Sequence, residues 1–544
     1  MRFIKSVDST KILVLIFTYI SITYFFIAKI ANLDFDPYHD GFIFPPALVV
    51  AEGGMPNRDA FSPYGPLSPL IQGKWLFLFG KDVISLRMHG VFLLLVVFTM
   101  LFVLLCGYLD FYLALLIATL WILSNPLIVQ PTLPWPDLYV CILQLFVLIL
   151  AKNQRTQKSS WLFILIGFIS GLSIFIKINF ILSFFLAIIL MFIFKTSFIQ
   201  ISRFAMGGLA SISLASVLMN LFGIANSYFD QSIKYSFLMH NQDRDLRGLI
   251  NVKILIYGVL FYLIFFCIKK FSLQVSKVNA FLISFTCSLI VLLIAVFQFR
   301  KLNEPFFSAG SDLIKNLQLI MKWLTYSPMF AVFFFVFIEL AKSIFHRGQN
   351  LSNSKLVFLL STTELIRLYP SPEPGHMWFM FPVLCVGLFS IKRIGESIMR
   401  FRIPISGVAL AAVVSSFCIL LNYVSFQRVD FQSNFLNGMK SNVSSVRAID
   451  ATIREIRIKG ISGQIDFRCL LGIYSVASGK YMSIDFHYAN LPHDIFERPR
   501  SKQIFVCGDL TSAEFQIPSK AKELFNLPGY FPNTRNILYE IPSE

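Results

Sequence analysis

The stretch WLFILIGFISGLSIFIKINFILSFFLAIILMFIF, residues 161–194, holds 34 residues and only one charged side chain, that of Lys177. A helix needs about 20 apolar residues to cross the hydrocarbon core of a bilayer. The stretch is therefore too long for one crossing and long enough for two short ones. We predict two membrane spans, 161–176 and 179–194, joined by a turn that holds Lys177 on the outer side.

The composition of the whole chain agrees with this prediction. Of its 544 residues, 56% are hydrophobic and only 14% are charged, and the mean hydropathy is +0.69. These values predict a polytopic membrane protein with membrane lipids around it. The net charge of +17 arises mainly in short loops between apolar runs, where the positive-inside rule collects Lys and Arg. It therefore indicates topology and no nucleic-acid partner.

Apolar runs, oriented by the basic residues between them, predict an α-helical protein with about thirteen membrane spans and a cytoplasmic N-terminus. The first run is too long for a signal-peptide core and lacks a cleavage site, so we interpret it as an uncleaved span. The predicted spans are 12–30, 84–108, 111–129, 137–151, 161–176, 179–194, 204–224, 250–268, 278–298, 323–341, 356–369, 377–391 and 404–424.

The character of the chain changes after residue 424. In residues 425–544, 26 of 120 residues are charged, against 51 of 424 before them. Short apolar runs such as LLGIYSV and QIFVCGDL predict strands. An odd number of spans places this tail outside the cytoplasm, so we predict two domains, a membrane domain at 1–424 and a small extracytoplasmic α/β domain at 425–544.

We expect this second domain to be an accessory one that shapes acceptor access and can be deleted from a folded core. It contains Cys469 and Cys507, whereas the other six cysteines are scattered in apolar segments. An oxidising compartment would permit a disulfide between this pair. The sequence leaves open whether it forms.

The first outer loop, 31–83, contains the sequence DPYHDGFIFPPALVVAEGGMPNRDAFSPYGPL from residue 36. Residues 42–52 are apolar enough for a short helix at the membrane interface, which Gly53 would end. A second amphipathic stretch covers 66–80. We expect the two helices to form a shelf at the membrane surface, with the acids of the loop at its edge.

This loop resembles the first outer loop of the GT-C membrane glycosyltransferases, which include protein mannosyltransferases, aminoarabinose transferases and the RgtA/B/C/D-like group. In those proteins an acidic pair, an interfacial helix, a Gly, a basic and acidic pair and a Tyr/Pro-rich turn follow one another. Thirteen spans with an outer C-terminal domain are similar to that group too. One departure is that His39 and Asp40 stand where Asp-Glu is common, which leaves open which acid is catalytic.

The resemblance implies an enzyme that moves a hexose or pentose from a polyprenyl-phosphate donor to a hydroxyl of a glycan, lipid or protein acceptor. It would act at the outer face of a bacterial-type plasma membrane. A carboxylate must remove the hydroxyl proton, and we expect Asp40 to do so, with Asp36 second and Asp34 third. The alternative is that these acids are helix N-caps and solvated loop residues.

The departing phosphate needs a cation. We predict that role for Lys177, which matches a Gly-Leu…Lys element of GT-C relatives, and consider Arg58 and His39 as further phosphate ligands. The alternatives are a snorkelling lysine at a helix end, a local Arg58–Asp59 ion pair that fixes the loop, and a histidine without a ligand role.

Two further outer segments contribute candidates. Asp137 opens the fourth span, and the resemblance implies a cavity-facing acid there, although N-capping explains it equally well. In the turn PSPEPGHM, Pro and Gly break the backbone before His376, a candidate for the donor phosphate or the acceptor, with Glu373 close by. Tyr64 belongs to the loop motif and is our third cavity candidate.

A metal requirement stays open. Asp243 and Asp245 have a D-x-D spacing, but alone it is a weak signal and we interpret the segment as a solvated loop. No cofactor is certain, and a divalent metal is compatible with the sequence. The rival functions are a transporter or lipid-carrier flippase, and a polymerase or ligase of cell-envelope glycans. Transporters tend to have repeat-related halves and broken helices near the bilayer midplane, whereas this chain collects its polar groups at one face.

Overall fold

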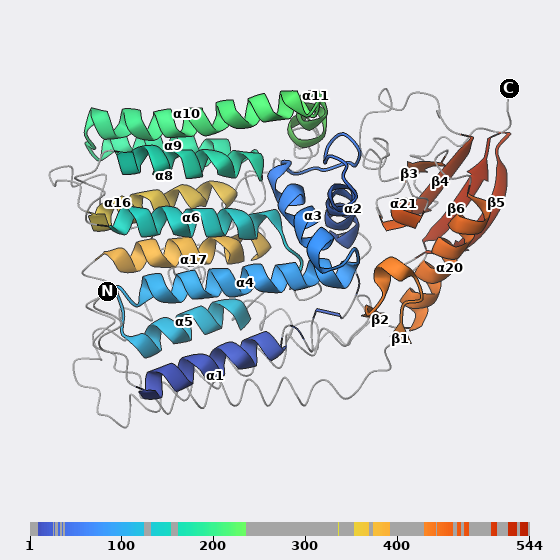
Figure 1. The fold of residues 1–544 in the computed structure, drawn as a ribbon, viewed down its shortest axis with the longest axis horizontal. Helices are drawn as coiled ribbons and strands as arrows, with labels where there is room; N and C mark the ends of the chain where they lie inside the picture. Colours follow the sequence, from blue (N-terminus) through green and yellow to red (C-terminus); the bar gives the residue numbers. More distant parts are fainter. Residues whose placement is uncertain are drawn as a thin grey trace, which may run out of the picture.

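The computed structural model has three parts along its long axis: a helix bundle, two short helices across one end of it, and a domain with a small sheet (Figure 1). Everything below concerns the residues that the structure describes. These are 9–25, 27, 31–32, 35, 39–123, 132–153, 161–234, 336, 353–368, 374–391, 429–441, 443–460, 465–468, 473–477, 502–508, 520–529 and 534–541.

The bundle consists of long helices that run side by side (Figure 1). In the described residues they are α1 (Ser9–Phe25), α4 (Val83–Leu105), α5 (Phe111–Leu123), α6 (Pro136–Lys152), α8 (Trp161–Leu172), α9 (Phe180–Ile193), α10 (Phe198–Leu221), α16 (Asn353–Thr362) and α17 (Pro374–Ser390). Each overlaps a predicted span. Among the described residues, α4 and α10 alone combine the length and hydropathy of a membrane-crossing helix, and α1, α8 and α9 are shorter apolar helices.

The helical class is therefore confirmed, whereas the number of thirteen spans stays a prediction. The predicted spans 250–268, 278–298 and 404–424 lie outside the described residues, as does all of 323–341 except residue 336. The boundary at residue 424 between the two predicted domains also lies outside them.

The predicted break in the apolar block is confirmed as a break between two helices. α8 ends at Leu172, a short 3-10 turn (η3, Ser173–Phe175) follows, and α9 begins at Phe180. Lys177 lies in the turn between them. Lys177 is the one charged residue of this block, so the break between the helices lies where the charge interrupts the run.

α8 and α10 approach each other closely because both contain glycines at the crossing. A Cβ on Gly167 would collide with the carbonyl of Phe204, and one on Gly207 would collide with the carbonyl of Ile164. Small residues that allow backbone contact are typical of helix pairs in membranes, where van der Waals packing replaces the hydrophobic effect. This packing fixes the position of the turn at Lys177 relative to the end of α10.

The two short helices, α2 (His39–Ala51) and α3 (Leu67–Phe79), lie across one end of the bundle (Figure 1). Gly53, with φ of 93°, ends the first segment as predicted. The expected shelf is wrong for α2, because nearly the whole helix from Asp40 to Ala51 is buried in protein. Only α3 keeps an exposed apolar side, with Phe77 and Leu78 on it.

The C-terminal domain is an α/β unit. Its sheet has the strand order β3 (Ile465–Arg468), β4 (Gln503–Gly508), β6 (Arg535–Glu540) and β5 (Lys522–Pro528), and only the β3–β4 pair is parallel. The helix α20 (Val443–Lys459) covers the sheet, and Asn536 of β6 donates to Thr452 of α20 at 2.9 Å. A two-stranded ribbon, β1 (Val429–Asp430) and β2 (Lys440–Ser441), precedes α20 and encloses the turn η8 (Asn434–Leu436).

One of the two predicted strands of this domain is correct. QIFVCGDL contains β4, whereas LLGIYSV overlaps the short helix α21 (Ile473–Ala477). A short apolar run fits a buried helix as well as a strand, and here Ile473 and Tyr474 are both 0% exposed against α2 and α20. Cys469 lies outside the described residues, and Cys507 is described only as a position of β4 opposite Asn536. The pairing of Cys469 with Cys507 therefore stays as open as the sequence leaves it.

The first loop and the C-terminal domain share one apolar core. Phe35 meets Phe431 edge-on with ring centroids 5.5 Å apart, and Phe44 of α2 stacks on Phe435 at 6.3 Å. The backbone amide of Lys440 donates to the carbonyl of Asn32 at 2.7 Å. The domain is thus built onto the loop, which differs from the separable accessory domain that the sequence predicts.

Candidate functional site

Most of the predicted site residues that the structure describes lie at one end of the bundle, which we call the loop end. α4 and α6 begin here, α8 and α10 end here, and α2 and α3 lie across it (Figure 1). Hydrogen bonds tie these pieces together: Gln72 of α3 donates to the carbonyl of Pro134 at 2.8 Å, just before α6. The loop end is therefore one connected structure.

Asp40 forms a buried ion pair that the sequence does not predict. The guanidinium of Arg87, one turn into α4, donates through Nε to Oδ1 at 3.2 Å and through Nη2 to Oδ2 at 2.7 Å. Both side chains are 0% exposed. Nη1 of Arg87 also donates to the carbonyl of Ala31 at 3.4 Å. A charged residue inside a predicted span is the sequence signal that could have identified Arg87.

This geometry bears on the predicted base. A general base must come within hydrogen-bond reach of the hydroxyl that it deprotonates, and Asp40 has no exposed surface in this structure. It is the second residue of α2, in the first turn, and both its oxygens are used to hold α2 against α4. Its role as base stays a prediction that requires the pair with Arg87 to open. Asp36 and Asp34 lie outside the described residues.

Two other candidates meet directly. Nζ of Lys177, in the turn between α8 and α9, lies 3.1 Å from Oδ2 of Asp137, at the start of α6. The side chain of Lys177 is 19% exposed and that of Asp137 is 5% exposed. Lys177 is therefore partly exposed to solvent, whereas its partner Asp137 is nearly buried. The pair lies where α8 ends and where α6 and α9 begin. The sequence predicts each residue separately but not their pairing.

The first loop is seated on the same turn. The amide of Gly65 donates to the carbonyl of Ile176 at 3.0 Å, one residue before Lys177. A Cβ on Gly65 would collide with the carbonyl of Phe175, so only glycine permits this approach. Tyr64, beside it, is half-buried, and its carbonyl accepts a hydrogen bond from Ser232 at 2.8 Å. The Tyr-Gly-Pro motif thus brings the loop to the phosphate-binding candidate.

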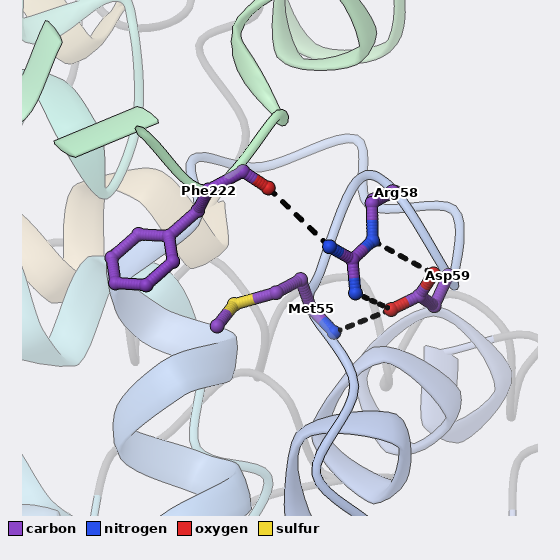
Figure 2. Close-up of polar contacts among 4 residues, drawn as sticks. All are labelled: Met55, Arg58, Asp59 and Phe222. Atoms are coloured by element: carbon purple, nitrogen blue, oxygen red, sulfur yellow. Dashed lines mark hydrogen bonds and ion pairs between the residues drawn. The ribbon is translucent and has the colours of Figure 1, made fainter. Parts of the chain in front are cut away.

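Figure 2 shows how Arg58 connects the first loop to the end of α10. Its guanidinium donates to both carboxylate oxygens of Asp59, at 3.0 and 2.8 Å, and to the carbonyl of Phe222 at 3.4 Å. Asp59 also accepts from the amide of Met55 at 2.8 Å. The hydrogen bond from Arg58 lowers the pKa of the Asp59 carboxyl. Phe222 caps the C-terminus of α10, an end that favours a cation.

The alternative interpretation of Arg58, a local ion pair that fixes the loop, therefore matches the geometry. Its side chain is still 49% exposed, so a role in binding phosphate remains a prediction.

A buried polar network anchors the loop to the segment after α10. This segment comprises the turn α11 (Ala225–Tyr228) and the π-helix η4 (Phe229–Lys234). Gln231 accepts from the amide of Ser62 at 3.1 Å and donates to the carbonyl of Asn57 at 2.9 Å. Asn57 adopts a φ of 63°, a backbone conformation that asparagine tolerates. Polar residues spread over distant segments leave no periodic signal, so sequence reasoning missed this network.

Of the two candidate histidines, the structure describes the side chain of His39 and only the backbone of His376. His39 packs edge-on against Trp135, with ring centroids 5.3 Å apart, two residues before Asp137. His376 lies in the first turn of α17, and its side chain is outside the described residues, as is Glu373.

Trp378, also in α17, stacks on Trp121 of α5, and each indole N–H donates to the other residue's carbonyl, at 3.0 and 2.7 Å.

In the part of the chain that the structure describes, no group of His, Cys, Asp or Glu has the arrangement of a metal site. The D-x-D pair, Asp243 and Asp245, lies outside that part. Comparison of the chain with protein-family models, with curated proteins and with solved structures gives no match.

Proposed function

We propose that this protein is a membrane glycosyltransferase of GT-C type, which transfers a sugar from a polyprenyl-phosphate donor to an acceptor hydroxyl at the outer face of a plasma membrane. The observation that carries the proposal is the pair of Lys177 and Asp137, 3.1 Å apart and partly open to solvent at the loop end. The loop that resembles the GT-C motif is hydrogen-bonded, through the amide of Gly65, to the carbonyl of Ile176, the residue before Lys177.

Lys177 is the proposed phosphate ligand. A charged side chain beside apolar helices is costly and marks a functional site by default. A lysine ammonium is a compact charge on a flexible stem, so Lys177 can turn from Asp137 to a phosphate at the same boundary. The positive charge would stabilise the phosphate as the glycosidic bond breaks.

The acid that acts as base belongs to the first loop. Because Asp40 is fully buried against Arg87, we favour Asp36, four residues earlier, as the reacting carboxylate, with Asp40 as the residue that positions this part of the chain. Asp137, released from Lys177 when the donor phosphate binds, would face the sugar or the acceptor as a second acid.

The test uses purified protein in nanodiscs, with polyprenyl phosphate as the probe and its retention measured by native mass spectrometry. Lys177→Met keeps the apolar stem and removes the cation, and should weaken binding about tenfold or more. Asp137→Asn removes the competing carboxylate and should leave binding equal or tighter. Lys195→Met, an exposed lysine after α9 at the opposite end of the bundle, is the matched control.

Equal binding by Lys177→Met and the wild type would overturn the role of Lys177. Sugar transfer is then followed with cell extracts that supply labelled lipid-linked donors. Movement of intact lipid-linked sugar across liposomes, without release of the sugar, would instead favour the flippase.

A further inference from the structure

α3 has two sides of opposite character. The inner side faces α2 and the chain before α6: Gln72 and Leu76 are buried, and a Cβ on Gly73 would collide with Val50. The outer side carries Ile71, Lys74 and Leu78, which are spaced three and four residues apart and so lie along one face of a helix. This face is open in the structure, although it is strongly apolar.

The apolar exposure extends around the C-terminal end of α3. Phe77, Leu78 and Phe79 are 66%, 70% and 61% exposed, and Ile71 is 40% exposed. Three consecutive large apolar side chains in water are unfavourable, because each loses most of the free energy that burial would give it. A patch of this kind marks an interaction surface.

Two exposed lysines accompany these apolar side chains. Lys74 lies within α3, Lys81 follows its end, and both are exposed. α3 contains no acidic residue. The nearest acid in the sequence, Asp82, is the N-cap of α4, where its carboxylate accepts from the amide of Ser85 at 2.7 Å. The surface therefore combines large apolar groups with a local excess of positive charge.

An aromatic cluster lies beside this surface. Trp75 of α3 packs on Phe79 at 4.3 Å, stacks on His89 of α4 at 4.7 Å, and lies 5.5 Å from Phe92 of α4, as measured between ring centroids. Its indole N–H donates to the carbonyl of Ser85 at 2.9 Å. Aromatic rings with a polar edge collect at the headgroup level of membranes. Phe92, 49% exposed, continues the apolar surface onto the side of a helix long enough to cross a membrane.

We propose that α3 lies in the headgroup layer of the outer leaflet and binds the phosphates of anionic lipids through Lys74 and Lys81. Phe77, Leu78 and Phe79 would enter the acyl region below. The continuity with Phe92 favours lipid over a protein partner, and the two lysines favour anionic over neutral headgroups. The proposal goes beyond the sugar-transfer reaction and does not depend on it.

The experiment uses full-length protein in nanodiscs of mixed phosphatidylglycerol and phosphatidylcholine. The lipids retained by the protein are counted by native mass spectrometry. Replacement of Lys74 and Lys81 by Ala should lower the enrichment of phosphatidylglycerol by about fivefold for each lysine. Lys520→Ala with Lys522→Ala, two exposed lysines of the C-terminal domain, is the matched control and should retain the enrichment.

Depth is measured separately with lipids brominated in the acyl chain. Wild-type protein should lose more fluorescence than Trp75→Phe, because Trp75 lies beside the inserted face. Unchanged phosphatidylglycerol enrichment in the Lys74 and Lys81 double variant would overturn the proposal. So would equal quenching of wild type and Trp75→Phe, or a stable dimer that Phe77→Ser dissociates, since α3 would then contact protein.

Discussion

At the scale of single residues, the pair of Asp40 and Arg87 carries the clearest energetic consequence. Both side chains are 0% exposed, and each satisfies the charge of the other. Removal of one partner from such a pair leaves a buried charge without compensation and costs about 3–5 kcal/mol. Replacement of both by apolar residues of similar volume can be nearly neutral. The pair can therefore be tested as a unit.

Arg87→Met should lower the unfolding free energy by about 3–5 kcal/mol, and Asp40→Leu by a similar amount. The double variant should recover most of the loss. Thermal unfolding of the detergent-solubilised protein measures all three variants in one cycle. Additive losses in the double variant would show that the two residues do not act as a pair.

The same residues distinguish positioning from catalysis. If Asp40 positions the loop, Asp40→Asn should reduce sugar transfer in step with the stability that it loses. A fall of two to four orders of magnitude with unchanged unfolding would restore Asp40 as the base and remove Asp36 from that role.

The Arg58–Asp59 pair predicts a pH dependence of the loop. Because the pKa of Asp59 is lowered in the folded protein, mainly by its hydrogen bond with Arg58, the folded state binds this proton less readily than the unfolded chain does. The contribution of the pair is complete at neutral pH and is lost as the pH falls through the lowered pKa. Arg58→Gln should weaken this acid-dependent step, and the hydrogen bond from the amide of Met55 should preserve the rest. Limited proteolysis of the loop between neutral and acid pH measures it.

Lys177 could be predicted from the sequence because a charge inside an apolar block is visible without a partner. Its pairing with Asp137 could not, since the two are separated by 40 positions and no periodicity connects them. The same holds for Arg87 and Asp40, 47 positions apart.

At the scale of elements, the contact of the loop with the turn before α9 depends on Gly65. Gly65→Ala would force the loop away from the carbonyl of Phe175, while the bundle helices keep their own packing. We expect faster proteolysis of the loop and reduced sugar transfer, with little change in the unfolding of the bundle.

Gly223→Asn is the control for this variant. Gly223 has a φ of 68° and open space around it, a conformation that asparagine tolerates. Equal proteolysis of Gly65→Ala and Gly223→Asn would show that the contact at Phe175 does not hold the loop.

Elements that rest on a long apolar run agree with their prediction, whereas short runs agree only in part: β4, α2 and α3 form as predicted and α21 does not. Each long bundle helix named above follows from an apolar run. The run LLGIYSV predicts a strand where α21 forms, because a short, mostly apolar run does not distinguish a strand from a buried helix. The burial of α2 depends on a domain that lies far away in the sequence, so no pattern within residues 42–52 indicates it.

At the scale of the whole molecule, the shared core changes the expectation for the C-terminal domain. Deletion of residues 425–544 would expose Phe35 and Phe44, which pack on Phe431 and Phe435. We expect an aggregating product with a disordered first loop, in contrast to a folded core. Size-exclusion chromatography and proteolysis of the truncated protein measure this. A monodisperse product with a protected loop would contradict the shared core.

The predicted orientation is tested by a reporter fused after residue 430. It should be active only outside the cytoplasm, since the domain lies at the loop end, opposite Lys152 and Lys195 at the other ends of α6 and α9. Cytoplasmic activity would reverse the orientation and remove the outer-face chemistry.

The stacking of Phe44 on Phe435 also means that α2 reaches its final packing only after the C-terminal domain has been synthesised. α2 leaves the ribosome among the first segments, and its cover is synthesised near the end of the chain. At about 5–20 residues per second, the interval is on the order of 20–80 seconds. Throughout it, an apolar helix that later touches only protein must be sheltered by lipid or by a chaperone. A chain that ends before residue 429 would therefore leave Phe44 without the partner that it stacks on in the complete fold.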